Sequence, residues 1–267
     1  MSSLTSRILI AAVLLPVVIG VVYLGGWWLF ALALVVGLIA LHELYGMARE
    51  LRPLVPGGYL GFALALLGLQ LGGLVWMVGG ILATLAFSFV VFGLSDVRPS
   101  ATTSFGVTLL GVVWVGAGLG YLLLIRDISD FGFWAVMAVL FTVFAADTGA
   151  FFVGRTLGRH KMAPAISPAK SWEGFVGGVV AATVTAFVIL YKDRGEFLGI
   201  PEMLALGALI ALAAAIGDLF ESAVKRDLTV KDSGRILGGH GGMLDRLDSH
   251  LWAAPAAFYV ILSFGHA

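Results

Sequence analysis

The chain has 267 residues, of which 60% are hydrophobic and only 12% are charged, and its mean hydropathy is +1.03. These values exclude an ordinary soluble domain and indicate a protein that resides in a lipid bilayer. Sixteen Lys and Arg residues balance sixteen Asp and Glu residues, and no basic tract lies outside the loops, so we expect no nucleic-acid partner. The chain has no cysteine, which excludes disulfides and thiolate-bound metals.

Nine apolar segments follow one another along the chain, each close to the roughly 20 residues that a helix needs to cross the hydrocarbon core. We therefore predict an all-α, polytopic integral membrane protein with about nine transmembrane helices. The segments cover approximately residues 8–24, 27–42, 56–72, 74–95, 105–125, 131–154, 174–191, 203–221 and 250–265.

Two boundaries in this series are less distinct than the others. The third and fourth segments meet at Gly72-Gly73 without an intervening charge. The first segment follows Arg7 and has the length of a signal peptide, but it continues through Gly25-Gly26 into another apolar span with no polar mature sequence after it. We therefore expect the first segment to be retained as a helix.

The basic residues orient these helices, since cytoplasmic loops accumulate Lys and Arg. With nine spans, three basic residues fall on one side: Arg126, Lys192 and Arg194. The other side receives thirteen: Arg7, Arg49, Arg52, Arg98, Arg155, Arg159, Lys161, Lys170, Lys225, Arg226, Lys231, Arg235 and Arg246. We therefore expect a multi-pass protein of the cell (inner or plasma) membrane, with loops 155–173 and 222–249 facing the cytosol and its nucleotides.

The loop over residues 222–249 concentrates basic side chains in a chain that has few of them. Lys225 and Arg226 are adjacent at the end of the eighth span, and Lys231, Arg235 and Arg246 follow. Together they could neutralise several phosphate oxygens. Singly, each could instead satisfy the positive-inside rule and the helix dipole.

A glycine-rich turn surrounds the histidine of this loop, in the run Gly238-Gly239-His240-Gly241-Gly242. Four residues without a β-carbon allow the backbone to turn tightly and to direct N–H groups at an anion. The alternative is a flexible loop with an isolated histidine. Because the run lies between the basic group and an acidic pair, we favour the anion site.

Acidic residues indicate a metal site beside these cations. Asp245 and Asp248 are three residues apart, so on a helical turn both carboxylates face one way and could hold Mg²⁺. Alternatively, Asp248 or Ser249 caps the ninth helix. Asp218 and Asp147 lie inside apolar spans, where an unpaired carboxylate is costly and usually marks a site. For Asp147, a hydrogen bond to a neighbouring helix is the alternative.

The loop over residues 155–173 is weaker evidence when taken alone. Lys170 could bind phosphate, and Ser171 could cap the seventh helix. Trp172 could be an interfacial anchor or a contact for lipid or base.

These residues together resemble the signature of the phosphatidate cytidylyltransferase (CDP-diacylglycerol synthase) family. The family pattern is met by Ser222, Lys225, Arg226, Lys231, Asp232, Gly234, Gly238, His240, Gly241, Gly242, Asp245, Arg246 and Asp248. The segments Ser167 to Gly174 and Asp147 to Arg155 also resemble the family. Two positions depart from it: Ala169, where a second basic residue is frequent, and Phe151, where tyrosine is frequent.

The resemblance implies the Mg²⁺-dependent reaction of CTP with phosphatidate to give CDP-diacylglycerol and pyrophosphate. The site could hold a second cation beside Mg²⁺. The resemblance covers the carboxyl half of the chain from about Asp147. We therefore divide the chain into an amino-terminal membrane region of about five spans, residues 1–130, to which we assign no chemistry, and a catalytic membrane region, residues 131–267. A homodimer is expected by analogy. We assign catalysis to Lys225, Arg226, Lys231, Asp232, His240 and Arg246. We assign substrate binding to Ser222, Lys170, Ser167, Glu173, Gly241 and Gly242, and metal binding to Asp218, Asp245, Asp248 and Asp147.

Two other functions could be built on buried acids in a membrane protein. A related lipid cytidylyltransferase or a polyprenol kinase could share such a site, and the chain could instead be a secondary transporter. A transporter would be expected to show interrupted helices in two matched halves, and the sequence shows no internal repeat.

Overall fold

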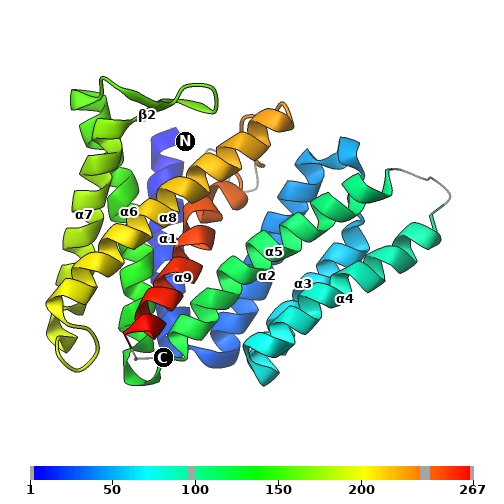
Figure 1. The fold of residues 1–267 in the computed structure, drawn as a ribbon, viewed down its shortest axis with the longest axis horizontal. Coiled ribbons are helices and arrows are strands. Elements are labelled where there is room, and N and C mark those ends of the chain that lie inside the picture. Colours follow the sequence, from blue (N-terminus) through cyan, green and yellow to red (C-terminus); the bar gives the residue numbers. More distant parts are fainter. Residues whose placement is uncertain (1–2, 96–99, 235–240, 265–267) are drawn as a thin grey trace. The chain divides into compact units, whose positions relative to one another are not determined.

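The computed structural model describes residues 3–95, 100–234 and 241–264, and within these ranges the chain is almost entirely helical (Figure 1). The long helices of these ranges are α1 (Ser3–Leu24), α2 (Gly26–Met47), α3 (Val55–Gly72), α4 (Leu74–Gly93), α5 (Ala101–Arg126), α6 (Gly132–Leu157), α7 (Trp172–Leu190), α8 (Ile200–Asp227) and α9 (Leu244–Ser263). Short 3₁₀ turns occur at Arg49–Leu51, Ser129–Phe131 and Tyr191–Asp193.

Each predicted apolar segment overlaps one of these helices. Seven helices in the described part of the chain, α2 to α8, are long and apolar enough to cross a membrane. The predicted all-α, multi-pass membrane class is therefore confirmed at this level. The number of nine crossings stays a prediction, because three of the first five residues of α9 are charged and the fully described part of α1 contributes the shorter apolar stretch Leu14–Leu24.

The indistinct boundary at Gly72-Gly73 is a true break between helices. Helix α3 ends at Gly72 and α4 begins at Leu74. Gly73 lies between them with a φ of 75°, a conformation that residues with a side chain adopt only at a cost. A glycine at this point therefore lets two apolar helices separate without any polar linker.

The chain folds into two compact units. The first comprises residues 1–123 and 228–246, and the second comprises residues 124–227 and 247–267. The polar segment that follows α8 therefore belongs with the amino-terminal helices.

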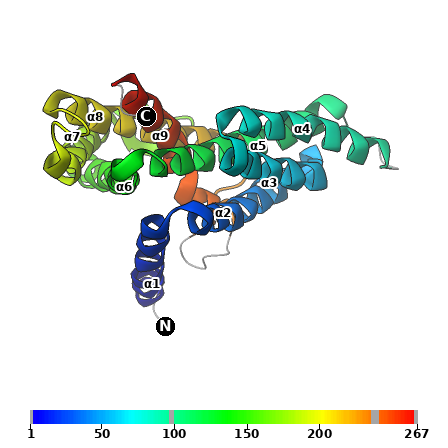
Figure 2. The same cartoon turned by 90° about the horizontal axis from the view of Figure 1, so that it is seen from below.

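In the first unit, helices α3 and α4 pack side by side (Figure 2), and α2 packs on α3. A β-carbon at Gly57 of α3 would lie 2.6 Å from the hydroxyl of Ser88 in α4, so these helices approach closely at a residue without a side chain. The hydroxyl of Tyr45 in α2 donates a hydrogen bond of 2.8 Å to the carbonyl of Thr108 in α5. Small residues and a few buried hydrogen bonds thus hold this unit together, as is usual where lipid removes most of the hydrophobic driving force.

In the second unit, α7 packs along both α6 and α8 through small side chains. A β-carbon at Gly178 would lie 2.7 Å from the carbonyl oxygen of Ala146, so the backbones of α7 and α6 nearly touch. Ala146, Ala182 and Ala211, one from each helix, are buried together. This close packing fixes the three helices from which the candidate site is built.

The loop over residues 155–173 contains a short antiparallel hairpin, which the sequence analysis did not predict. Strand β1 (Lys161–Ala163) pairs with β2 (Ser167–Ser171), with Lys161 opposite Ser171. Strands this short, one of them containing Pro168, show no clear alternation of polar and apolar residues, which explains why the sequence pattern did not reveal them.

Candidate active site

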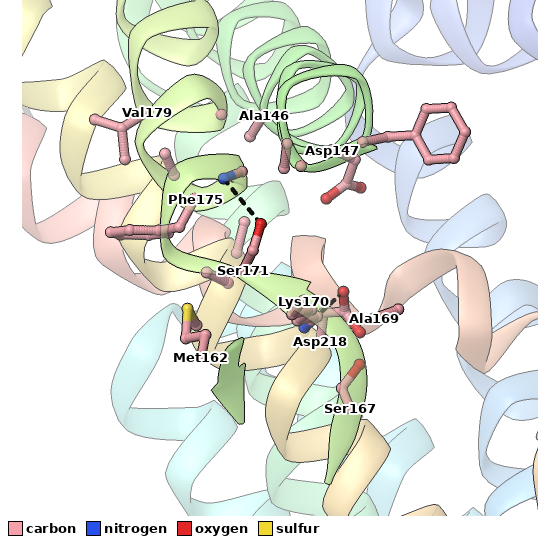
Figure 3. A pocket seen from close by; sticks show the side chains of 18 of the residues that line it. Ala146, Asp147, Met162, Ser167, Ala169, Lys170, Ser171, Phe175, Val179 and Asp218 are labelled. Carbon is pink, nitrogen blue, oxygen red and sulfur yellow. Dashed lines mark hydrogen bonds and ion pairs between the residues drawn. The ribbon is translucent and has the colours of Figure 1, made fainter. Parts of the chain in front are cut away.

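A cavity of about 620 Å³ lies in the second unit among α6, α7, α8 and the hairpin (Figure 3). Its polar lining includes Asp147 of α6, Lys170 and Ser167 of β2, and Asp218 of α8. Alanine, glycine and valine residues of the three helices form much of the remaining wall. The structure thus places both acids predicted inside the apolar spans, Asp147 and Asp218, on one cavity.

The carboxylate of Asp218 is paired with a lysine from the hairpin. The Nζ of Lys170 lies 2.8 Å from Oδ2 of Asp218, and their side chains are 23% and 37% exposed. Figure 3 shows the side chains of Lys170 and Asp218 meeting, and Ser167 lies nearby on strand β2, which also carries Lys170. Charges in a largely apolar cavity carry a desolvation cost that their mutual attraction offsets only in part, so this pair makes the cavity a candidate functional site.

The last turns of α8 carry the first part of the predicted signature. The hydroxyl of Ser222 lies 3.4 Å from Oδ1 of Asp218, one turn earlier. The Nζ of Lys225 lies 2.7 Å from Oε2 of Glu221, and Glu221 is 1% exposed. The Nε of Arg226 donates a hydrogen bond of 3.3 Å to the carbonyl of Ile166 in the hairpin turn. Ser222, Lys225 and Arg226 therefore lie with Asp218 near the carboxyl end of α8, and these contacts orient their side chains.

Asp248 of α9 belongs to this cluster. Its Oδ1 accepts a hydrogen bond of 2.6 Å from the backbone N–H of Ser249. Burial, and after it the nearby carboxylate of Asp218, raises the pKa of Asp248 above its ordinary value. Two carboxylates from two helices therefore lie close enough to repel one another.

The proximity of these acids depends on a glycine. A β-carbon at Gly217 would lie 2.6 Å from the carbonyl oxygen of Asp248 and 2.9 Å from the indole of Trp252. Helices α8 and α9 can therefore approach only where α8 has no side chain. Because Asp218 follows Gly217 directly, this approach brings its carboxylate near Asp248.

The base of the hairpin is fixed by Ser171 and Glu173. The hydroxyl of Ser171 accepts a hydrogen bond of 3.2 Å from the N–H of Gly174 and so caps α7, as predicted. The carboxylate of Glu173 accepts hydrogen bonds from the N–H groups of Arg159 and His160. These contacts hold the entry to the hairpin, and the predicted role of Glu173 in substrate binding stays a prediction.

The second part of the signature, as far as Arg246, lies in the first unit. The carboxylate of Asp245 accepts hydrogen bonds from the N–H of Gly242 at 2.8 Å and of Ser233 at 3.1 Å. Gly241 has a φ of 79°, and a β-carbon there would lie 2.8 Å from Oδ2 of Asp245. The predicted glycine turn is thus, at Gly241 and Gly242, a turn that wraps a carboxylate.

The remaining predicted residues are exposed or lie outside the described ranges. Lys231, Asp232 and Arg246 are exposed. His240, with Arg235, Gly238 and Gly239, lies outside the described residues, so its predicted role stays a prediction.

A hard cation would fit the acids of the second unit. Within the described ranges, no three Asp, Glu or His side chains form a ready metal cage. Magnesium, however, commonly binds through one or two carboxylates together with substrate phosphates. Asp218 and Asp248 provide two carboxylates that repel one another, and Asp147 lines the same cavity as Asp218. This donor set suits a cation that arrives with a phosphorylated substrate.

Two acids that the sequence analysis did not single out take part in these arrangements. Glu221 lies buried beside Lys225 and Asp248. Glu43 of α2, in a region to which we assigned no chemistry, contacts the segment that contains Asp245. Both acids lie within or beside long apolar runs, where burying a carboxylate costs free energy. An acid in such a run was the signal that could have identified them.

Comparison with known proteins gives one consistent family. The sequence pattern of the cytidylyltransferase family matches residues 5–264. A protein named phosphatidate cytidylyltransferase from Staphylococcus haemolyticus is 34% identical over 252 residues, which cover 93% of this chain and 95% of the relative. Proteins of the same name from Bacillus subtilis and Staphylococcus aureus strain COL are 38% identical over 161 residues and 32% identical over 253 residues. These alignments cover 60% and 93% of this chain, and 59% and 95% of the respective relatives.

Proposed function

Because this chain belongs to the cytidylyltransferase family and is thus a nucleotidyltransferase, we propose that it transfers the cytidylyl group of CTP to phosphatidate in phospholipid biosynthesis. The observation that carries the proposal is the charged pair of Lys170 and Asp218 in a cavity with largely apolar walls. Such a cavity suits a substrate with a phosphate head and an apolar body. The names of the relatives support phosphatidate as that substrate.

In the proposed reaction, a phosphate oxygen of phosphatidate forms a bond with the α-phosphorus of CTP. The bond between that phosphorus and the oxygen bridging to the β-phosphate breaks, and pyrophosphate leaves with the electron pair. The nucleophile is the substrate phosphate itself, so no side-chain nucleophile is needed. The protein must bring two anions together and stabilise the charge on the leaving group.

The basic residues supply this stabilisation in our proposal. Lys170 is held beside the cavity by Asp218 and can exchange that carboxylate for a phosphate. Lys225 and Arg226 at the end of α8, with Lys231 in the exposed segment that follows and Arg246 in the first turn of α9, bind the triphosphate. Glu221 and the carbonyl of Ile166 orient Lys225 and Arg226 through the contacts described above.

We further propose that Asp218 and Asp248 hold Mg²⁺, with Asp147 as an additional ligand, and that Asp245 is a ligand of a second cation. When bound, Mg²⁺ would neutralise phosphate charge on the nucleotide. The repulsion between Asp218 and Asp248 supports this assignment, because a cation between them would remove it.

The membrane location supports an interfacial reaction. The acyl chains of the lipid substrate remain in the bilayer while its phosphate meets a soluble nucleotide, so we place the cavity at the cytosolic face. The thirteen basic residues assigned to that side in the sequence support this orientation. We retain a homodimer as a prediction, to be measured by light scattering of the protein in detergent.

Pyrophosphate release by the purified protein tests the proposed function. We expect release in detergent only when CTP, phosphatidate and Mg²⁺ are all present. Release without phosphatidate would indicate another acceptor. No release from a folded preparation, judged by circular dichroism and a sharp gel-filtration peak, would contradict the proposal.

A further inference from the structure

Glu43 is a buried acid in α2, far in sequence from the predicted catalytic region. It is 5% exposed and lies in a helix that is long and apolar enough to cross a membrane. A carboxylate in such a place is costly unless its oxygens accept hydrogen bonds, and it rarely persists without a role.

The carboxylate of Glu43 contacts the segment between α8 and α9 at two points. Its Oε2 accepts hydrogen bonds from the hydroxyl of Ser233 at 3.1 Å and from the backbone N–H of Leu244 at 2.9 Å. Ser233 is 6% exposed and Leu244 is fully buried. One carboxylate oxygen therefore fixes the two ends of the segment that runs from Ser233 to the start of α9.

One of these two points, Ser233, also holds Asp245. The N–H of Ser233 donates to the carboxylate of Asp245, and the hydroxyl of Ser233 accepts a hydrogen bond of 3.3 Å from the N–H of Asp245. The hydroxyl of Ser233 thus lies between Glu43 and Asp245 and bonds to both. A change at Glu43 is therefore transmitted to Asp245 through one side chain.

Two glycines leave room for Glu43. A β-carbon at Gly234 would overlap Oε1 of Glu43, and one at Gly242 would overlap both Oε2 of Glu43 and the hydroxyl of Ser233. Both glycines belong to the signature segment. Because neither residue has a side chain, the carboxylate of Glu43 can approach the backbone at both positions. This contact accounts for the two glycines without a bound ligand.

We infer that Glu43 is a positioning residue, which holds Ser233 and the residues 242–245 together so that Asp245 and Arg246 are presented to the nucleotide. Its own carboxylate need not touch a substrate. The inference rests on the proposed function for its kinetic consequence, but its structural claim can be measured separately.

The test compares Glu43→Gln, which keeps the shape of the side chain, with Glu43→Asp and with Ser233→Ala. Glu50→Gln is the matched control, because Glu50 is an exposed acid whose side chain is 87% accessible. Hydrogen exchange of peptides that cover residues 228–234 and 241–246 reports on these contacts without any substrate. Steady-state kinetics with CTP and phosphatidate report on its use.

We expect Glu43→Gln to remain folded, to exchange faster than wild type at residues 233–234 and 241–245, and to lose at least about tenfold in kcat/KM for CTP. Ser233→Ala should show the same two changes, and the double variant should lose little more than the worse single variant, because both substitutions break one connected set of bonds. Glu43→Asp should recover part of the loss. Glu50→Gln should match wild type in both measurements.

Wild-type exchange at residues 233–234 and 241–245 in Glu43→Gln would overturn the inference, and so would wild-type kcat and KM in that variant. A loss of activity that disappears when rates are expressed per folded molecule would also overturn it, since Glu43 would then act on stability alone. If the wild-type protein itself transfers no cytidylyl group, the proposed function fails, while the exchange measurement still decides whether Glu43 holds the segment.

Discussion

Lys170 of the hairpin and Asp218 of α8 form an ion pair of 2.8 Å at the polar centre of the cavity. The pair joins a strand and a helix whose sequences are almost fifty residues apart. Asp218 also lies near Ser222 on its own helix and near Asp248 of α9. Substitutions at this pair are therefore the most direct probe of the site.

We predict that Asp218→Asn lowers kcat by about 10²-fold or more, because it removes both the proposed metal ligand and the partner of Lys170. Lys170→Met should cause a comparable loss in kcat/KM. The double variant should lose less than the product of the two single losses, because the side chains act as a unit. Lys192→Met, at an exposed lysine of the 3₁₀ turn after α7, is the control and should keep wild-type kinetics. If the loss in the double variant equalled the product of the two single losses, the two side chains would act independently and not as a pair.

Removal of divalent cations provides a second prediction. Treatment with EDTA should abolish turnover, and added Mg²⁺ should restore it. Asp248→Asn should raise the Mg²⁺ concentration needed for half-maximal activity, since one of two adjacent carboxylates no longer attracts the cation. A variant with the wild-type Mg²⁺ dependence would remove Asp248 from the proposed metal site.

Arg226 should not be replaceable by lysine. Its Nε is bound to the carbonyl of Ile166, and its planar guanidinium can keep that bond while other N–H groups face a phosphate. We expect Arg226→Lys to lose about tenfold in kcat/KM for CTP with little change in thermal stability. Arg194→Lys, at an exposed arginine next to Tyr191, is the matched control. Equal effects of the two substitutions would argue against a specific role for Arg226.

The packing of α7 on α6 gives a prediction about stability. Gly178→Ala places a methyl group 2.7 Å from a backbone carbonyl, and such overpacking typically costs about 1–3 kcal/mol. Gly79→Ala of α4 is the control, because a β-carbon there meets no atom within 4 Å. Thermal unfolding in detergent should show a lower midpoint for the first variant only. An unchanged midpoint for Gly178→Ala would mean that α6 and α7 are less closely packed than described.

Loss of the cap of α7 should also destabilise the protein. Ser171→Ala removes the hydroxyl that accepts from Gly174, a change that usually costs about 0.5–2 kcal/mol. Thermal unfolding of Ser171→Ala, with Ser171→Thr as the variant that retains a capping oxygen, measures the effect. Equal midpoints for Ser171→Ala and wild type would show that the cap does not hold the hairpin base.

Much of the fold could be predicted from the sequence, because a helix that crosses a bilayer needs an apolar segment of roughly 20 residues. Each apolar segment became a helix, and even the division at Gly72-Gly73 was correct, since a glycine with positive φ separates α3 from α4. The hairpin at Lys161–Ser171 could not be predicted, because its strands are too short to show a pattern. The family predicted from residues 222–248 is confirmed.

The candidate site could be predicted only in part. Asp147, Lys170 and Asp218 were selected for their chemistry, and the structure places them on one cavity. The pair of Lys170 and Asp218 depends on the packing of the hairpin on α8, and the proximity of Asp218 to Asp248 depends on the close approach of α8 and α9 at Gly217. No local sequence pattern reveals either contact. Glu43 was missed for the same reason, because its partners Ser233 and Leu244 lie about 190 and 200 residues further along the chain.

The fate of labelled phosphate tests the central claim most directly. The purified protein is given phosphatidate, Mg²⁺ and CTP that carries radioactive phosphorus at either the α or the γ position, and the lipid is then extracted. We predict that the α label enters the lipid extract only when phosphatidate is present, and that the γ label stays in water as pyrophosphate. A γ label in the lipid would indicate a kinase, and an α label that never enters the lipid would contradict cytidylyl transfer to phosphatidate.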